Sequence, residues 1–520
     1  MTTSHHVPSE TPRAAALLGR SFGSIPALVV LHGAERPGQP ALIQGESQLG
    51  YGDLVRGMKR VAAALQREGL GKTDSIAICG ATSIDYVVLY LGALLAGLVV
   101  APLSPSSSRE ALIRMIVDSG AKRLFADPDV ARLVGDDPRL PATTSLMDLD
   151  AWLDASVPAD SEPRAVDVGP DDPFNIIYSS GTTGDPKGIV QPAMMRWMHL
   201  VRARANGVGP RSVALYSTPL YSNTTLASFF GAIGVGATSV LMAKFDTRDY
   251  LELAQRHRVT HTMLVPVQYR RLLADPGFNA YDLSSFVMKS STSAPFPAEL
   301  KAETLRRWPG GLTEVYGMTE GGGTCVLEAH RHPGKLHTVG VPAPGHDVRM
   351  IDDAGREVPR GEVGEIVGRS LSMMTGYRNR PAETAEIEWL DGEGRRYIRS
   401  GDVGRFDDDG FVTLLDRKKD MIISGGFNVF PSDLEAVLRE HRDLLESTVV
   451  GVASEQWGET PVAFVVVRPG AAPNAAAIRA WANERLGKMQ RLADLRIVER
   501  LPRSPIGKVL KRELRDAYRP

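Results

Sequence analysis

Tyr178-Ser-Ser-Gly-Thr-Thr-Gly-Asp-Pro-Lys-Gly188 is the stretch from which the interpretation of this chain starts. It follows a short apolar run, Phe174 to Ile177, which is typical of a buried strand. Glycines allow the backbone to aim its N–H groups at an anion, hydroxyl side chains add donors, and a lysine adds a point charge. The stretch therefore has the composition of a phosphate-binding loop that follows a strand.

The order of these residues differs from that of the common P-loop. Lys187 is followed by Gly188 rather than by Ser or Thr, and the sequence has no G-x-x-x-x-G-K pattern. Taken alone, a stretch this rich in Gly and Thr is also consistent with a surface turn. Later motifs must distinguish the two interpretations.

Length and composition bound the class of protein. A chain of 520 residues is too long for one hydrophobic core, so two or more domains are expected. The hydrophobic fraction of 43%, the charged fraction of 23% and the net charge of −1 are ordinary for a soluble protein and give no support for a nucleic-acid partner. Cys79 and Cys325 lie far apart, and residues 1–20 contain no apolar signal core, which together favour the cytoplasm.

One uncharged run, Val87 to Leu103, needs an explanation, since it is just short of the roughly 20 residues of a membrane span. Gly97 and Pro102 interrupt it. They divide the run into a helix that ends near Gly97 and a strand from Leu98 to Ala101. We expect a buried helix–strand unit, and a protein that is not integral to the membrane.

The remaining pattern predicts an α/β fold with a large N-terminal part. Strands and amphipathic helices alternate up to Tyr316, which is typical of parallel sheets. The expected strands are 41–43, 75–78, 123–126, 213–217, 239–242, 260–265 and 314–316, and the expected helices are 51–68, 108–119 and 266–273. Residues 1–22 are expected to be loose, and residues 154–172 to form a linker.

The composition and hydrophobic pattern of the sequence change after Gly340. Short segments at 348–351, 364–368 and 410–415, with many Gly and Asp, predict a small antiparallel barrel-like unit. Further on, helices are expected at 431–439 and 475–486, and strands at 446–452, 460–467 and 496–499. These predict a separate, compact α+β domain at the C-terminus.

Three later motifs contain residues suited to ligand binding, although each also has an ordinary structural explanation. Glu320, in Tyr316-Gly-Met-Thr-Glu320, follows a strand and suits nucleotide-bound Mg²⁺, but a Thr-Glu pair is also common at a helix start. Asp402 follows Ser400-Gly401 and suits a ribose diol, but an Asx-turn explains it as well. Asp416-Arg-Lys-Lys-Asp420, taken alone, is typical of a solvated face.

Taken together and in this order, the motifs resemble those of the adenylate-forming (AMP-binding) superfamily, in particular acyl-CoA synthetases similar to 4-coumarate–CoA ligases. The resemblance spans about residues 40–513 and ends in Pro502-Arg-Ser-Pro-Ile-Gly-Lys508. It implies a large N-terminal domain at 1–416, a hinge at 417–420 and a small mobile C-terminal domain at 421–520.

The resemblance also implies roles for individual residues. ATP and AMP would bind Ser179, Ser180, Gly181, Thr182, Thr183, Gly184, Lys187, Ser293, Ala294, Pro295, Tyr316, Gly317, Asp402 and Arg417. Glu320 and Thr182 would hold Mg²⁺, and Thr319 would bond a phosphate oxygen. Lys508 would stabilise the charge that builds on the phosphoryl oxygens as a carboxylate attacks the α-phosphate.

Other implied roles concern CoA and the acid. CoA would pass Gly425 and Gly426, and Lys419 would be the hinge residue. The acyl pocket would include Ser222, Met318, Gly321 and Gly322. The chain departs from the family pattern at Ile506, at Ile423, where some relatives carry a lysine, and at Ser222, where many have histidine.

The function that the resemblance implies is an acid–CoA ligase that uses ATP, Mg²⁺ and CoA. Two alternatives stay open, namely an adenylating enzyme that loads a separate carrier protein and a non-catalytic nucleotide-binding relative. Lys508, Glu320 and Asp402 are all present, which disfavours the last. The acid (aryl-propenoic, fatty or polycyclic) and the oligomeric state, a homodimer included, remain undetermined.

The sequence supports one expectation about the acid. Gly321, Gly322 and Gly323 add no side chains, so pocket volume should be left open, with Phe229 and Phe230 as apolar walls. Residues 316–325 and 216–230 contain no Arg or Lys to pair a second carboxylate. An acid with a sizeable apolar or aromatic body is therefore expected, since each buried CH₂ contributes about 0.8 kcal/mol.

Overall fold

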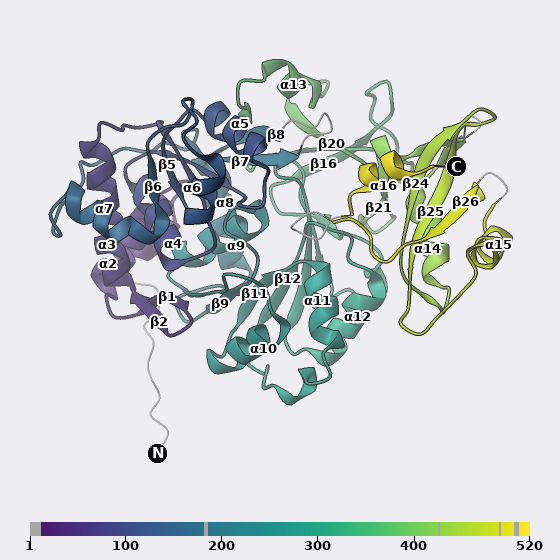
Figure 1. Ribbon diagram of the computed structural model, residues 1–520, viewed down its shortest axis with the longest axis horizontal. Helices are drawn as coiled ribbons and strands as arrows, with labels where there is room; N and C mark the ends of the chain where they lie inside the picture. The colour runs from purple at the N-terminus through teal and green to yellow at the C-terminus, as the bar shows by residue number, and fades with distance from the viewer. Residues whose placement is uncertain (1–11, 181–185, 425–426, 488–489, 504–508, 520) are drawn as a thin grey trace. The chain divides into compact units, whose positions relative to one another are not determined.

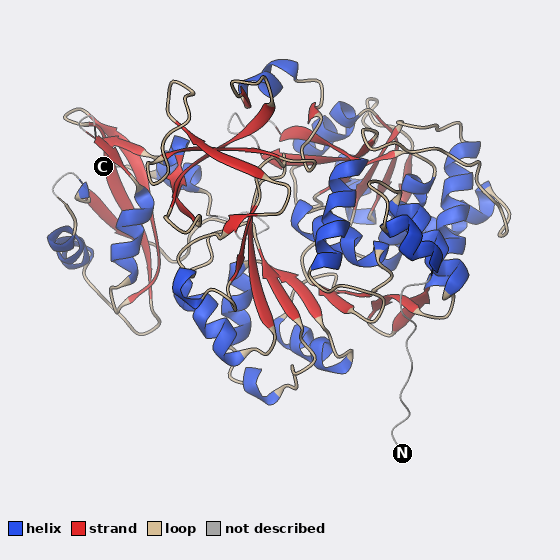
Figure 2. Ribbon diagram, turned by 180° about the vertical axis from the view of Figure 1, so that it is seen from behind, coloured by secondary structure: helices blue, strands red, loops and turns tan. Residues whose placement is uncertain are grey.

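The computed structural model describes residues 12–180, 186–424, 427–487, 490–503 and 509–519. The chain forms two compact units. Unit 1 comprises Met1–Leu336, Ala343–Asp347 and Gly368–Ile398, and unit 2 comprises His337–Pro342, Val348–Val367 and Arg399–Pro520. The mixed α/β architecture, with a large N-terminal part and a smaller C-terminal part, is the predicted one (Figures 1 and 2).

Unit 1 contains most of the helices (Figure 1). They are α1 (Pro12–Leu18), α2 (Ile25–Glu35), α3 (Tyr51–Arg67), α4 (Ile84–Leu95), α5 (Arg109–Ser119), α6 (Pro128–Val134), α7 (Leu149–Ser156), α8 (Ala193–Ala205), α9 (Asn223–Gly234), α10 (Thr247–Arg256), α11 (Pro266–Ala274), α12 (Ala298–Arg307) and α13 (Pro381–Glu386). The expectation that residues 1–22 are loose is wrong for the described part from residue 12, because α1 buries Ala14 and Leu18 in the core.

A seven-stranded sheet in unit 1 carries the Gly/Thr-rich stretch. In spatial order its strands are β18 (Gly376–Tyr377), β8 (Pro186–Pro192), β7 (Pro173–Ser180), β4 (Val99–Leu103), β3 (Ser75–Cys79), β5 (Ala121–Ala126) and β6 (Thr143–Ser145). The strands from β7 to β6 are parallel, whereas β8 is antiparallel to both β7 and β18. The predicted loop thus connects two paired strands.

A second sheet contains the strands that precede the other predicted motifs of unit 1. In order, its strands in this unit are β14 (Cys325–Glu328), β13 (Gly311–Tyr316), β12 (Met288–Ser291), β11 (His261–Leu264), β9 (Val213–Tyr216), β10 (Thr238–Leu241), β1 (Pro40–Gln44) and β2 (Ser47–Gly50). The strands from β13 to β1 are parallel, as expected. Because parallel strands end at one edge, the residues after β12 and β13 lie at the same edge of the sheet.

The uncharged run from Val87 to Leu103 forms the predicted buried helix–strand unit. The Ser83 hydroxyl caps α4 by accepting from the Tyr86 N–H, and Gly97, with a φ of 76°, allows the chain to turn into β4. Every residue of β4 is buried. In the described part of the chain, no helix is long and apolar enough to cross a membrane.

Unit 2 holds β15 (Val341–Pro342) and two further groups of strands. The first group contains β16 (Asp347–Ile351), β17 (Gly364–Arg369), β20 (Arg396–Phe406) and β21 (Val412–Arg417), and confirms the strands expected after Gly340. Strand β20 starts in unit 1, where it pairs with β19 (Glu388–Leu390), and its unit 2 part pairs with β21. Asp402 lies inside β20, next to Gly401 with a φ of 69°, rather than after a tight turn as expected.

The second group in unit 2 is the predicted α+β domain. Its sheet contains β22 (Ile422–Ser424), β23 (Phe427–Val429), β24 (Leu444–Ser454), β25 (Gly458–Val467) and β26 (Asp494–Ile497). Helices α14 (Pro431–Arg439), α15 (Ala475–Arg485) and α16 (Lys511–Ala517) accompany it. Leu434, Ile478, Val449 and Val465 form a core between α14, α15 and the strands.

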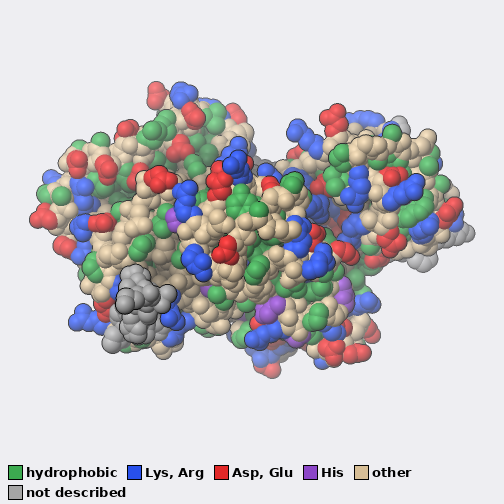
Figure 3. Space-filling view, turned by 90° about the horizontal axis from the view of Figure 1, so that it is seen from below, with side chains coloured by type: hydrophobic (Ala, Val, Ile, Leu, Met, Phe, Trp, Pro, Cys, Tyr) green, Lys and Arg blue, Asp and Glu red, His purple; other side chains and the backbone are tan. Residues whose placement is uncertain are grey.

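Acidic and basic side chains are mixed over the face of the molecule that Figure 3 shows. No single-sign field covers that face, which agrees with the net charge of −1. A nucleic-acid partner would need a concentrated basic surface.

Candidate active site

Glu320 lies four residues beyond the end of β13 and is held by Tyr377. The Tyr377 hydroxyl donates a hydrogen bond of 2.8 Å to Oε1 of Glu320. Burial and the adjacent carboxylate raise the pKa of Tyr377 well above its ordinary value, so the phenol keeps its proton near neutral pH. A carboxylate oriented in this way suits a Mg²⁺ ion.

Lys187, from the Gly/Thr-rich stretch, lies beside the same tyrosine. Its Nζ is 5.1 Å from the centroid of the Tyr377 ring. Tyr377 reaches this position because β18 pairs with β8 and sets Tyr377 opposite Ile189. The fold thus brings positions 187 and 320 to one aromatic side chain, which is the juxtaposition expected of a phosphate and metal site.

A buried network of amides supports Thr319. Gln191 Nε2 donates to the Thr319 carbonyl at 2.7 Å and to Asn223 Oδ1 at 3.2 Å. Gln191 Oε1 in turn accepts from Asn175 Nδ2 and from the buried Arg196 guanidinium. The sequence did not predict this network, although Asn175 and Gln191 are polar residues among the apolar residues of the strands on either side of the loop.

Ser293, which follows β12, has a φ of 77°, a conformation that few residues other than glycine adopt. Its hydroxyl is hydrogen-bonded to the Thr224 hydroxyl on α9. Ser222 lies at the N-terminus of α9 and is 9% exposed. Ala294, Pro295, Tyr316 and Gly317 follow or end parallel strands at the same sheet edge. The structure therefore groups these predicted residues around that edge.

The expectation that the glycines leave volume open in an acyl pocket is wrong for Gly321 and Gly322. A Cβ atom on Gly321 would lie 1.9 Å from the Ser372 carbonyl oxygen, and one on Gly322 would lie 2.7 Å from the Gly368 carbonyl oxygen. Backbone, rather than a pocket, occupies the space that these missing side chains leave. Met318 packs against a buried cluster that contains Ile189, Met374 and Ile398.

Phe229 and Phe230 do not wall a pocket either. They are 2% and 0% exposed and pack against each other at a centroid distance of 5.5 Å. Both belong to the main hydrophobic core of unit 1. Their apolar character reflects core packing rather than contact with an acid.

A cavity of about 60 Å³ lies between α8, α9 and the strands β9, β11, β12 and β13. It is lined by His199, Arg202, Ala203, Asn206, Val208, Ala214, Tyr216, Ala227, Ser228, Ala232, His261, Thr262, Met263, Met288, Ser290 and Val315. Val315 immediately precedes Tyr316, so the cavity adjoins the motif that ends β13. This makes it the candidate acyl pocket.

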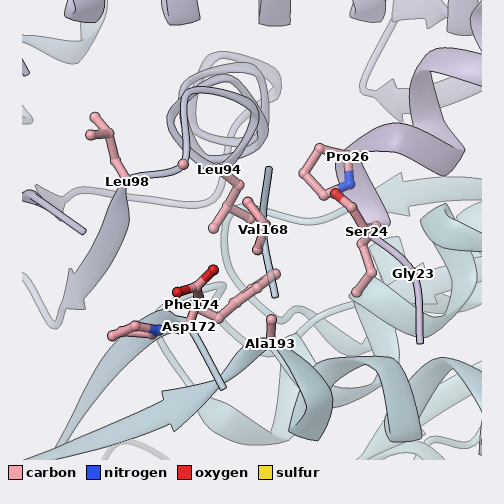
Figure 4. Close-up of a pocket in the computed structure, with 12 residues that line it drawn as sticks. Gly23, Ser24, Pro26, Leu94, Leu98, Val168, Asp172, Phe174 and Ala193 are labelled. Atoms are coloured by element: carbon pink, nitrogen blue, oxygen red, sulfur yellow. The ribbon is translucent and has the colours of Figure 1, made fainter. Parts of the chain in front are cut away.

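A smaller cavity of about 20 Å³ lies elsewhere in unit 1, among Ser24, Leu94, Phe174 and Ala193 (Figure 4). None of the predicted site residues lines it. Its one charged group, Asp172, already pairs with Lys72 at 2.7 Å. We interpret it as a packing gap.

Asp402 and Arg417 are paired within unit 2. They are opposite each other in the β20–β21 register, and Arg417 Nε lies 3.0 Å from Asp402 Oδ1. The predicted ribose ligand and the predicted nucleotide-binding arginine are thus neighbours. Lys418 is held by Glu365 at 3.1 Å and Asp353 at 2.7 Å, whereas burial lowers the pKa of the neighbouring Lys419.

Several predicted residues lie outside the described residues or lack a described side chain. Gly181, Thr182, Thr183, Gly184, Gly425, Gly426 and Lys508 are outside the described residues, and the side chain of Ser180 is not described. Ser179 is opposite Lys187 in the β7–β8 pair, so the described ends of the loop are in register. The roles of the remaining residues stay predictions.

Comparison with known protein families identifies the chain. The family model described as AMP-binding enzyme matches residues 31–378, and the model described as AMP-binding enzyme C-terminal domain matches residues 433–508. This chain belongs to the AMP-binding enzyme family. The resemblance to the adenylate-forming acyl-CoA synthetases is thereby confirmed.

Relatives of this AMP-binding enzyme include ligases with two kinds of acceptor. A feruloyl-CoA synthase from Amycolatopsis sp is 34% identical over 93% of this chain and 96% of its own length. A fatty acid–[acyl-carrier-protein] ligase, ScoC, from Streptomyces coeruleorubidus is 32% identical over 94% of this chain and 95% of its own length. Among solved structures, ATP-bound MatB from Rhodopseudomonas palustris is 28% identical, with a TM-score of 0.86 over 95% of this chain and 99% of that one.

Proposed function

We propose that this AMP-binding enzyme is an acid–CoA ligase for carboxylic acids with an apolar or aromatic body. In the first half-reaction, a carboxylate oxygen of the acid attacks the α-phosphorus of ATP and pyrophosphate leaves. In the second, the CoA sulfur loses its proton and attacks the acyl carbon, and AMP leaves with the bonding electrons. Adenylation replaces a poor leaving group with a good one and so divides one hard step into two easier steps.

The observation that carries the proposal is the contact of Tyr377 with both Lys187 and Glu320. A cation from a Gly/Thr-rich loop and a carboxylate beside it are what a magnesium-bound triphosphate requires. Glu320 would bind Mg²⁺ together with Thr182, and the metal would neutralise charge on the phosphates. The described residues contain no cluster of three or more His, Cys, Asp or Glu side chains that could hold a metal, so the phosphates would supply most of its ligands.

The apolar lining of the candidate acyl pocket supports the choice of acid. Tyr216, Met263, Met288 and Val315 present mostly carbon to the cavity. The feruloyl-CoA synthase relative points the same way, because its name specifies an aromatic acid. Burial of such a body stabilises the bound acid by about 0.8 kcal/mol per CH₂.

The role of Tyr377 can be tested with Tyr377→Phe. We expect about a tenfold loss of kcat for adenylation and a higher Mg²⁺ requirement, because Glu320 loses the hydrogen bond that orients it. Initial rates of pyrophosphate release at several Mg²⁺ concentrations measure both effects. The matched control is Tyr178→Phe, in β7, which removes a hydroxyl that donates to Asp118 of α5 and should leave the Mg²⁺ dependence unchanged. An identical Mg²⁺ dependence for both variants would contradict the assignment.

The hinge at 417–420 is a proposal that the family boundaries support. It lies between the two matched regions, which end at 378 and begin at 433. If adenylation uses Lys508 and thioester formation uses Gly426, the C-terminal domain at 421–520 must turn between the half-reactions. Lys419→Pro fixes φ and should slow thioester formation at least several-fold more than adenylation, whereas Lys419→Ala should not. Equal rates for both variants in the two half-reactions would count against a hinge here.

A panel of acids assayed with and without CoA tests the function as a whole. We expect pyrophosphate release with aryl-propenoic or medium-chain acids, and an acyl-CoA product when CoA is present. The ScoC relative supports one alternative, a ligase that loads a carrier protein. Adenylate formation without any acyl-CoA product, but with transfer to a phosphopantetheinyl carrier protein, would favour that alternative. Absence of pyrophosphate release with every acid would overturn both.

A further inference from the structure

The candidate acyl pocket has two chemically different ends. At the β13 end, Val315 and Ser290 line it near the predicted adenylate site. At the other end, Arg202 from the last turn of α8 and Asn206, the residue that follows this helix, lie with His261, the first residue of β11. Most of the other lining residues are apolar. By the roughly 10–15 Å³ that one water needs, the volume of about 60 Å³ accepts a few small groups.

Arg202 is the only Lys or Arg that lines this cavity in the described part of the chain, and no carboxylate there pairs with it. Arg202 is half-buried, and partial loss of solvent around its guanidinium lowers its pKa. No acidic side chain among the described residues that line the cavity neutralises the positive charge of Arg202. The groups that act on His199 and His346 include the Arg202 cation itself. A half-buried cation in a cavity wall whose described residues include no carboxylate favours an anion from outside the chain.

The three imidazoles near Arg202 carry no charge near neutral pH, so Arg202 supplies the positive charge of the cavity. Burial lowers the pKa of His199 well below its ordinary value, with Arg202 and Arg196 adding to the effect. Burial also lowers the pKa of His346, which is hydrogen-bonded to the Gly322 carbonyl. It lowers the pKa of His261 as well, although a contact with the Asn206 backbone partly offsets this shift. All three are therefore neutral near pH 7.

His261 provides a second polar group in the wall of the cavity. It is 8% exposed, and its Nδ1 is hydrogen-bonded to the Thr260 hydroxyl at 2.8 Å. Its Nε2 makes no hydrogen bond of normal geometry within the described residues. A buried imidazole nitrogen in the wall of a cavity can bond a polar group of a ligand that enters.

We propose that Arg202, assisted by His261, selects an acid that carries a second carboxylate at the far end of its apolar body. This rests on the proposed function, since it names the substrate class of the same pocket. The first carboxylate would be activated at the β13 end, and the second would pair with the guanidinium, whose planar fork matches a carboxylate. The sequence disfavoured this class, because residues 316–325 and 216–230 contain no Arg or Lys to pair a second carboxylate. Arg202 comes from α8, outside both stretches.

The test compares acids of equal length with one or two carboxylates, namely octanoate with suberate and hexanoate with adipate. We expect the full-length wild-type enzyme to favour the better diacid over its monoacid by about tenfold or more in kcat/KM. Arg202→Leu should lose this preference while it retains turnover of the monoacid, and Arg202→Lys should keep part of it. Arg204→Leu, on the same helix but outside the cavity lining, is the control and should keep all of it.

Each outcome decides the proposal. A preference of the wild type for monoacids, or a diacid preference that survives in Arg202→Leu, overturns it. If no acid releases pyrophosphate, the proposed function fails, and binding without ATP becomes the test of this site. Suberate should then raise the thermal unfolding midpoint of the wild type more than octanoate does, and should not do so for Arg202→Leu. The absence of that difference also overturns the proposal.

Discussion

Replacement of Lys508 with alanine is expected to abolish acyl-adenylate formation. In the proposed reaction, the attack on the α-phosphate builds charge on the phosphoryl oxygens, and the lysine ammonium is the group that stabilises it. Loss of one such contact costs roughly 3–4 kcal/mol, or about 10²–10³-fold in rate. Thioester formation from pre-made acyl adenylate and CoA should continue, because that step does not require the lysine. Pyrophosphate release and acyl-CoA formation, measured separately on one preparation, give the two rates.

The control for this experiment is Arg512→Ala, which removes a cationic side chain from the nearby helix α16. Its guanidinium lies 4.0 Å from the Asp516 carboxylate. Both half-reactions should proceed within about twofold of the wild-type rates, since exposed pairs of this kind contribute little. Equal damage to the two half-reactions in Lys508→Ala would instead mean that Lys508 has a structural role.

Replacement of Gly321 with alanine is expected to destabilise unit 1 severely. The added Cβ would lie 1.9 Å from the Ser372 carbonyl oxygen, and the φ of 78° disfavours any residue with a side chain. The neighbouring Gly322 N–H donates to the same carbonyl at 2.9 Å, so the 368–373 backbone cannot retreat without losing a hydrogen bond. Overpacking and backbone strain together cost about 2–6 kcal/mol. Urea unfolding followed by tryptophan fluorescence measures the loss.

Gly334→Ala is the matched control for this substitution. A Cβ atom there meets no other atom within 4 Å, and the residue is exposed. The unfolding midpoint should stay close to that of the wild type, since such surface changes are usually within about 0.5 kcal/mol. If Gly321→Ala proved as stable as Gly334→Ala, the glycine would be present for pocket volume, as the sequence first suggested.

The sequence predicts the fold well where hydrophobic periodicity is strong. Helix 51–68 and strand 75–78 were expected close to their observed bounds, Tyr51–Arg67 and Ser75–Cys79. Local patterning alone determines such elements, because each buries one continuous apolar face. The prediction for Asp402 failed in its detail, since the pairing of β20 with β21 overrides the turn tendency of Ser400-Gly401.

The sequence by itself determined the family and the identity of the motif residues, because the binding of ATP needs particular side chains in short, ordered strings. The tertiary structure alone decided which distant residues join them. Tyr377 reaches Glu320 through the pairing of β18 with β8, and Arg202 lines the candidate acyl pocket because α8 packs beside α9. Neither is marked by any local pattern. Their roles arise from contacts across long sequence separations, which periodicity and spacing do not encode.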